Sequence, residues 1–142
     1  MAGETPQLLK FDICVYRKSD IPFEDFIKWA TVEYPPRTVP IMKKHGIVQF
    51  AQTVTPPELR EAYRNVLKND LGRLEWTVSD YDLVLSYWLR SPNDLVALTQ
   101  DPEWIELEKD ARARINFSIG HFVIGHEIVQ LTSSDARVAA TA

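Results

Sequence analysis

The sequence predicts an α+β fold in which a four-stranded antiparallel sheet carries helices on one of its two faces. Two observations lead to this prediction. Four stretches are rich in β-branched and apolar residues, most clearly in an alternating pattern typical of strands. Between them, apolar residues recur at helical spacing, several times behind a proline. With 142 residues, of which 45% are hydrophobic, the chain can form one domain with a sizeable core.

The first strand is predicted at residues 8–17. Its apolar side chains share one face: Leu9, Phe11, Ile13 and Val15. A helix is predicted at 23–29, where Phe23, Phe26 and Ile27 recur at helical spacing. Pro35 and Pro36 are expected to interrupt it, because proline lacks the N–H that a helix interior needs. A second helical piece is predicted at 39–44, before Gly46.

The second strand is predicted at residues 47–55, which are rich in β-branched side chains. A mostly polar helix follows at 57–68, with Leu59, Tyr63 and Leu67 on one side.

The third strand, at residues 81–89, carries the strongest strand pattern in the chain. Ser91-Pro92 is typical of a helix start and predicts a short helix at 94–99. A longer helix is predicted at 102–116, and the last strand at 119–131.

This order of elements is that of a ferredoxin-like fold with one additional helix between the second and third strands. Such a sheet has one face without helices. That face is not convincingly polar here, since Cys14, Tyr16, Val84 and Trp88 lie on it whenever their neighbours face the helices. A monomer rarely exposes so large an apolar surface. We therefore expect a homodimer in which the two free faces pack together and close an α/β barrel.

The charge pattern limits the partners. The net charge is −4 and both signs are interspersed, which argues against a nucleic-acid or membrane-surface partner. No apolar stretch predicts a transmembrane span, and the first residues do not resemble a signal peptide. A single cysteine, Cys14, excludes a disulfide framework, so we expect a cytoplasmic protein. The domain is predicted to cover 1–131, and 132–142 to form a disordered tail.

His121 and His126 stand in an apolar run, each directly after a glycine. A spacing of five residues in a strand puts them on opposite faces, about 16 Å apart, so one metal ion does not readily use both. We expect no metal and no cofactor. One histidine should face the helices and the other the dimer, and the sequence leaves open which. Each can also be an ordinary packed imidazole.

Further candidates are weighed against structural roles. His45 ends a predicted helix, where a cation is stabilising without any chemistry. Asp82 is a candidate to orient an imidazole and Tyr87 to support it, although a buried carboxylate is also satisfied by an arginine. The candidate substrate contacts are polar residues at the mouth of a cleft and flat aromatic rings: Arg37, Glu33, Tyr34, Asp12, Tyr16, Trp88, Trp76 and Trp104. Each can instead be an ordinary solvated, ion-paired or core residue without a role in binding.

The order of elements resembles the EthD-type branch of the dimeric α/β-barrel proteins. In that branch, a tryptophan in the first helix is followed four residues later by a histidine and then by Ala-Pro. The matching text here is Trp29-Ala-Thr-Val-Glu33-Tyr34-Pro35. Trp29 and Pro35 match, whereas Glu33 stands in the place of the family histidine.

Several phrases are also similar to small fungal decarboxylases that act on atrochrysone carboxylic acid in aromatic polyketide clusters: 11–18, 33–36, 44–46, 81–90, 101–104 and 119–123. The resemblance implies a cofactor-free decarboxylase of an aromatic polyketide β-keto acid. Such an enzyme stabilises an enolate and returns a proton, for which His121, then His126 and His45, are the predicted acids. A dehydratase or cyclase would use the same groups. The scaffold would also suit a non-catalytic anthrone-binding protein or, less readily, a haem or flavin oxygenase.

Overall fold

The structure is a computed structural model that describes residues 8–133. The elements run in the order β1 (Leu9–Arg17), α1 (Phe23–Lys28), the π-helical turn η2 (Trp29–Glu33), α2 (Pro35–Lys44), β2 (Gln49–Val54), α3 (Pro57–Asn69), β3 (Leu83–Leu89), α4 (Pro92–Gln100), α5 (Pro102–Arg112) and β4 (Ile115–His126). Of the predicted tail, Thr132 and Ser133 are exposed and outside any element, and 134–142 lies outside the described residues.

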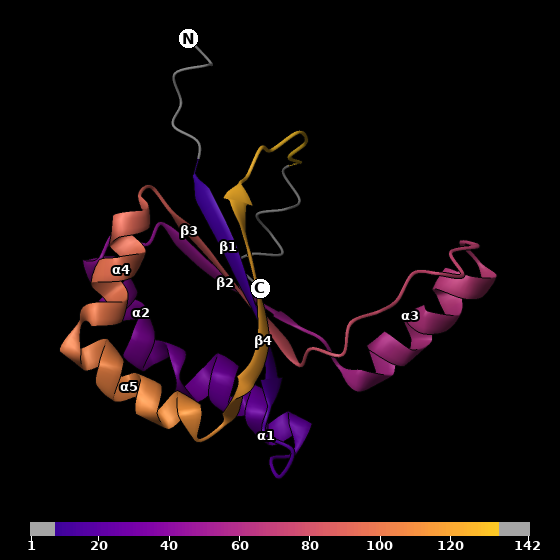
Figure 1. The fold of residues 1–142 in the computed structure, drawn as a ribbon, viewed down its shortest axis with the longest axis horizontal. Coiled ribbons are helices and arrows are strands. Elements are labelled where there is room, and N and C mark those ends of the chain that lie inside the picture. The colour runs from indigo at the N-terminus through magenta and orange to yellow at the C-terminus, as the bar shows by residue number, and fades with distance from the viewer. Residues whose placement is uncertain (1–7, 134–142) are drawn as a thin grey trace.

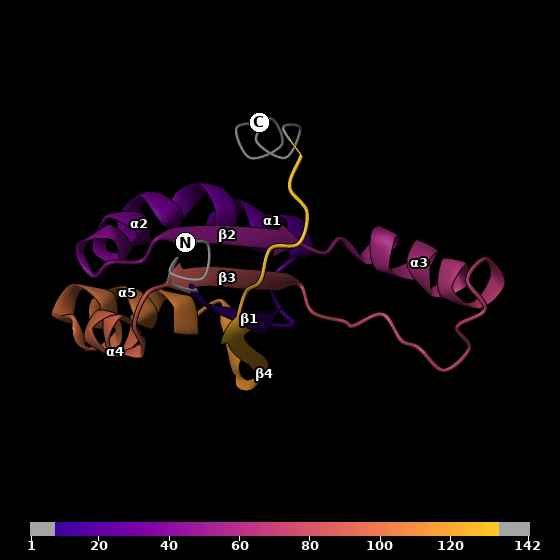
Figure 2. The ribbon, with the colours of Figure 1, turned by 90° about the horizontal axis from the view of Figure 1, so that it is seen from above.

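The four strands form one antiparallel sheet in the order β2-β3-β1-β4. The helices α1, α2, α4 and α5 cover one face, and α3 projects away from the sheet (Figures 1 and 2). This is the ferredoxin-like α+β fold that the order of elements predicts. Within residues 8–133, no helix is long and apolar enough to cross a membrane.

The core lies between the sheet and these helices. The odd-numbered face of β1, from Leu9 to Val15, packs against them as predicted, and in β3 the helix-facing residues include Leu83 and Leu89. The largest fully buried side chains are Phe11, Phe26, Leu83, Leu89 and Leu98. Burying each such side chain stabilises the fold by about 1.5–3 kcal/mol.

The prediction was wrong about the boundary between the last helix and the last strand. α5 ends at Arg112 rather than at 116, and β4 begins at Ile115 rather than at 119. Ile115 pairs with Arg17 and joins the apolar core, so tertiary packing overrides the local helical pattern. β4 ends at His126 rather than at 131, because its partner strand starts at Leu9, opposite His126.

The two prolines do not separate the helices in the way predicted. Instead, α2 starts at Pro35 itself, where the missing N–H is harmless, and not at 39. The N–H of Tyr34 reaches back to the carbonyl of Trp29 at 2.8 Å, which makes the π-helical turn. In an α-helix that N–H would bond to the carbonyl of Ala30. The freed Ala30 carbonyl accepts a hydrogen bond from the Gln52 side chain of β2, at 2.8 Å.

Replacing Gln52 by leucine would leave the carbonyl of buried Ala30 without its partner. We expect Gln52→Leu to lower the free energy of unfolding by about 1–3 kcal/mol. Urea unfolding measures the change. As a control, Gln100→Leu at an exposed position of α4 should stay within about 0.5 kcal/mol of the unmodified protein. Equal stability of the two variants would contradict the role of Gln52.

Candidate functional site

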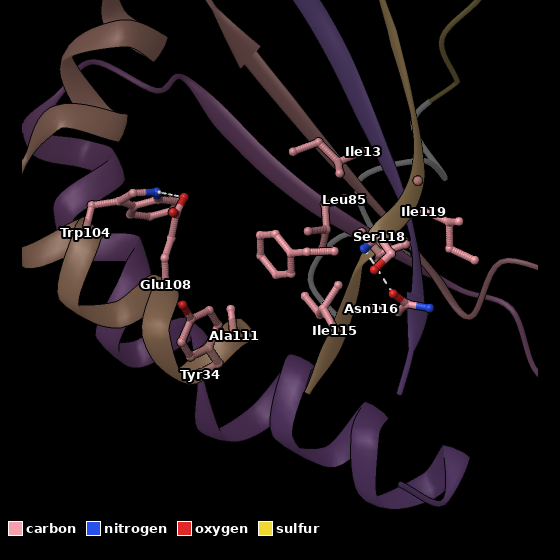
Figure 3. Close-up of a pocket in the computed structure, with 13 residues that line it drawn as sticks. Ile13, Tyr34, Leu85, Trp104, Glu108, Ala111, Ile115, Asn116, Ser118 and Ile119 are labelled. Carbon is pink, nitrogen blue, oxygen red and sulfur yellow. Dashed lines mark hydrogen bonds between the residues drawn. The ribbon is translucent and has the colours of Figure 1, made fainter. Parts of the chain in front are cut away.

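A cavity of about 430 Å³ lies between the sheet and the helices. It is bounded by β1, β3, the start of α2, α5 and the first half of β4 (Figure 3). Its apolar wall is made by Ile13, Val15, Leu85, Ala111, Ile115 and Phe117. The part of β4 that borders the cavity is irregular. Val15 pairs with Gly120 and Arg17 pairs with Ile115, so residues 116–119 of β4 lie opposite a single residue of β1 and form a bulge. This bulge carries Asn116 and Ser118 to the cavity.

One carboxylate faces this cavity. Glu108 of α5 accepts a hydrogen bond from the indole N–H of Trp104, at 3.1 Å, one helical turn earlier (Figure 3). Its other oxygen lies 3.8 Å from the guanidinium of Arg112, whose charged group also stacks over the ring of Phe117. Glu108 is therefore held in place by α5 itself and stays partly open to solvent, with 34% of its side chain exposed.

The second polar group is the phenol of Tyr34, at the start of α2. Its hydroxyl donates to the carbonyl of Leu107 in α5, at 2.7 Å. Burial raises the pKa of Tyr34 to about 12, and the negative charges of Asp110 and Glu108 add to this effect against the opposing charges of Arg37 and Arg114. The hydroxyl is therefore neutral at physiological pH and acts as a hydrogen-bonding group, not as a base.

Asp110 holds two neighbours of Tyr34, the side chains of Trp29 and Arg37. The ring of Tyr34 packs against Trp29 at 4.4 Å between centroids, and the indole N–H of Trp29 donates to Asp110 at 3.3 Å. Arg37 of α2 and Arg114 bond to the same carboxylate. Burial opposes ionisation of Asp110, but these hydrogen bonds and charges outweigh it and lower its pKa. The carboxylate thus joins η2 and α2 to α5 on one side of the cavity.

Of the residues predicted from the sequence, Tyr34 and Trp104 line this cavity, and the three histidines do not. His121 is exposed on the helix-free face of the sheet, opposite Cys14, and its Nδ1 bonds to the hydroxyl of Tyr81. His126 pairs with Leu9 and so belongs to the opposite face, as the spacing predicts. His45 caps α2 and bonds to Asp101 at 2.7 Å.

Asp82 and Tyr87, which were candidates to orient and support an imidazole, are both buried and contact groups other than histidine. Asp82 accepts hydrogen bonds from Arg17 and Arg60, so this buried carboxylate is satisfied by arginine. Tyr87 stacks on Phe11 in the core, at 4.6 Å between centroids, and burial raises its pKa.

The remaining predicted contacts are distributed over the molecule. Arg37 pairs with Asp110, and Glu33 is exposed beside a separate hollow. Three lie on the free face of the sheet: Asp12, which accepts from Ser86 at 2.5 Å, Tyr16, which packs on Tyr81, and Trp88, which donates to Glu127 at 2.8 Å. Trp76 is exposed in the loop after α3.

Sequence reasoning missed Glu108, Asn116 and Ser118. Glu108 could have been found, because it follows Trp104 by four residues and so lies on the same face of a helix. Asn116 and Ser118 were hidden by the misplaced boundary between helix and strand. Their local geometry is an Asx turn in which the Ser118 N–H donates to the Asn116 side chain, at 3.0 Å (Figure 3). Residues 8–133 contain no group of three or more histidine, cysteine or acidic residues that could hold a metal ion.

Comparison with known proteins places the chain in a family. Residues 18–117 match the EthD domain, and the chain belongs to the EthD domain family. The dehydratase iacD of Pestalotiopsis fici is 31% identical over 125 residues, which are 88% of this chain and 89% of that protein. The conidial pigment biosynthesis dehydratase EthD of Metarhizium robertsii is 24% identical, over 75% and 72% of the two chains.

Two further matches are more distant. A protein of Aspergillus terreus that carries the name of an oxygenase, not firmly assigned, is 26% identical over 70% of this chain and 61% of its own. Among solved structures, a protein of Arabidopsis thaliana superimposes with a TM-score of 0.53 at 9% identity, over 88% and 98% of the two chains. At that identity the likeness concerns the fold alone.

Asp110→Asn tests the link between α5 and the start of α2. The pKa of Asp110 is lower in the folded protein than in an unfolded chain, so its stabilising effect is complete above about pH 3.9 and is lost as the pH falls through the folded value. We expect Asp110→Asn to be less stable than the unmodified protein by about 1–3 kcal/mol at pH 7. The difference should shrink below about pH 4.

Urea unfolding at several pH values measures this difference, with the exposed Asp20→Asn as the matched control. A stability difference that does not change with pH would contradict the proposed role of the ionised carboxylate.

Proposed function

We propose that the protein is an acid–base enzyme that removes water from an aromatic polyketide bound in the cavity between sheet and helices. The observation that carries the proposal is that one carboxylate, Glu108, and one neutral phenol, Tyr34, line the same largely apolar cavity. The names of the fungal relatives, two of which are dehydratases, support the same class of reaction. The volume of about 430 Å³ is within the usual range for small-molecule sites.

In this proposal Glu108 is both base and acid. Its carboxylate can accept a proton from the carbon next to a carbonyl group of the substrate. The carbon–oxygen bond at the neighbouring carbon then breaks with its electron pair on oxygen. The proton on Glu108 passes to that oxygen, water leaves and the carboxylate is regenerated. The reaction needs no other reactant.

Tyr34 has a supporting role. While the proton is on Glu108, negative charge develops on the carbonyl oxygen of the substrate, and a fixed hydrogen-bond donor stabilises it. A phenol with a pKa of about 12 keeps its proton through this step. Its present acceptor, the carbonyl of Leu107, also accepts a helical hydrogen bond, so the hydroxyl can turn to a substrate without leaving that carbonyl unpaired.

Decarboxylation of a β-keto acid, the reaction that the resemblance implies, is the second candidate. An apolar wall and the negative Glu108 would destabilise a bound carboxylate and so favour the loss of carbon dioxide. The electrostatics nevertheless favour dehydration, because the described residues that line the cavity include one carboxylate and no lysine, arginine or histidine. An uncharged hydroxyketone is therefore easier to bind than a carboxylate.

We also propose that two copies pair through the free faces of their sheets. On that face Val84, Val123 and Trp88 stand beside the polar Tyr16 and His121, and Val123 is 59% exposed in the single chain. Such a surface is typical of an interface.

Glu108→Gln tests the catalytic proposal. Its amide oxygen can still accept the Trp104 N–H, but it cannot take up a proton. We expect kcat to fall by about 10²–10⁴-fold with little change in KM. Turnover of a hydroxylated aromatic polyketide is followed by mass spectrometry, in which loss of the mass of water identifies dehydration and loss of the mass of carbon dioxide identifies decarboxylation.

The matched control is Glu106→Gln, on the exposed side of α5. It should keep full activity. If Glu108→Gln is as active as this control, Glu108 is not the base. Binding of the polyketide by the unmodified protein without any turnover would support a non-catalytic binding protein, and a requirement for oxygen would support an oxygenase.

The acid–base role predicted for His121, His126 and His45 is tested by replacing each with alanine. Because these residues lie outside the cavity, the proposal for Glu108 expects each folded variant to turn over the substrate like the unmodified protein. A variant that loses activity while remaining folded by circular dichroism would return the catalytic assignment to that histidine.

A further inference from the structure

The segment between β2 and β3 forms an arm that the rest of the chain leaves unpartnered. It consists of α3 and the return loop, residues 56–80, and it extends away from the sheet (Figures 1 and 2). α3 buries none of its residues, and Leu59 and Tyr63 are each 52% exposed. These two side chains and Leu67 occupy one side of the helix and line a hollow of about 530 Å³ together with Val54 and Val78. We call this hollow the arm groove.

The arm is held in this position by charged groups at its base. Arg60 donates to the carbonyls of Thr55 and Asp80 and to the carboxylate of Asp82. Asp82 is 2% exposed and also accepts from the backbone and side chain of Arg17 in β1. A buried carboxylate that is bonded to two guanidinium groups fixes the direction of the chain, since losing either bond leaves a charge without a partner. The arm is thus held where its apolar side faces only the end of β2 and the return loop.

A second unpartnered surface lies at the other end of the sheet. After β4 the chain continues without a partner strand, and Ile128, Val129 and Leu131 are 63%, 64% and 89% exposed. This C-terminal segment, residues 127–131, leaves the sheet beside Leu9, whereas the arm leaves it beside Val15. Six residues of strand separate the two points, which is about 20 Å. In one chain, therefore, the apolar segment and the groove that could bury it start from opposite ends of the sheet.

We infer that the arm groove receives the C-terminal segment of a second copy of this chain. Because β2 and β4 are also the two edges of the sheet, the segment and the arm start from diagonally opposite corners. If two sheets pack face to face about a two-fold axis along the other diagonal, the segment of each copy reaches the arm of the other, and both pairs of surfaces are buried at once. The segment exposes three aliphatic side chains, and the apolar part of the groove lining consists of aliphatic and aromatic side chains, so each can bury the other. The inference rests on the proposed pairing of the free sheet faces and is continuous with it.

Disulfide trapping between full-length chains tests the inference. One chain carries Val129→Cys, and a second chain of different tag mass carries Leu59→Cys, Tyr63→Cys or Leu67→Cys. The native Cys14 is buried and its pKa is raised, mainly by burial, so it stays unreactive. After mixing and mild oxidation, we expect the mixed dimer between Val129→Cys and at least one arm position to form at least tenfold more than with Ile105→Cys, an exposed apolar position on α5.

Sedimentation gives a second measurement that does not require a cysteine. Tyr63→Glu in the arm and Val129→Glu in the segment should each raise the dimer dissociation constant at least tenfold, and Ile105→Glu should leave it unchanged. Both side chains are more than half exposed within their own chain, so circular dichroism should show folded variants in both cases.

Three results would overturn the inference. They are trapping no stronger than in the α5 control, arm cysteines that couple to each other in preference to Val129→Cys, and glutamate variants that dimerise like the unmodified protein. In each of these cases a persisting dimer leaves the pairing of the sheet faces intact. A protein that is monomeric at all concentrations overturns both, while the dehydratase proposal is decided separately by the mass of the product.

Discussion

The geometry of the helix side depends on how the chain passes from Trp29 to Pro35. Proline cannot donate a hydrogen bond, so the chain must begin a new helix there, and the N–H of Tyr34 reaches one residue further back than in an α-helix. The carbonyl of Ala30, which an α-helix would have paired with Tyr34, accepts a hydrogen bond from the side chain of Gln52 in β2 instead. Tyr34 stands at the end of this turn, and its hydroxyl donates to the carbonyl of Leu107 in α5. Backbone and side-chain hydrogen bonds together thus hold the phenol at the cavity.

Charge is distributed unevenly around this framework. Arginines gather on Asp110 and Asp82, behind the cavity and at the base of the arm, and leave Glu108 as the one formal charge among the described residues that line the cavity. The helix-side cavity and the helix-free face therefore differ in chemistry. The first combines an apolar wall with one carboxylate, and the second carries His121 with Tyr81 and Tyr16. An enzyme that handles neutral, weakly acidic carbon centres is consistent with the first arrangement.

Much of the fold could be predicted from the sequence, because alternation in β1 and β3 and proline-led helix starts are local signals. The class, the order of elements and the helix-facing side of β1 were all predicted in this way. The end of α5 could not be, since the residues up to Asn116 continue a helical pattern and only pairing with Arg17 draws Ile115 into a strand. The cavity was hard to predict for the same reason, because part of its wall comes from the start of β4. Tyr34 and Trp104 were predicted, but Glu108 was not, because it is one of many charged residues in its helix. The three histidines lie outside this cavity, and their predicted acid–base role stays a prediction.

The bulge at the start of β4 has a consequence for how such a protein can diversify. Residues 116–119 make no ladder pairs with β1, yet they border the cavity. Length and side chains can therefore vary there while the paired part of the strand, from Gly120 onward, keeps its register and the core beneath it stays closed. Changes of length or side chain in this one loop-like stretch would therefore alter the size of the cavity while the paired part of the sheet stays the same.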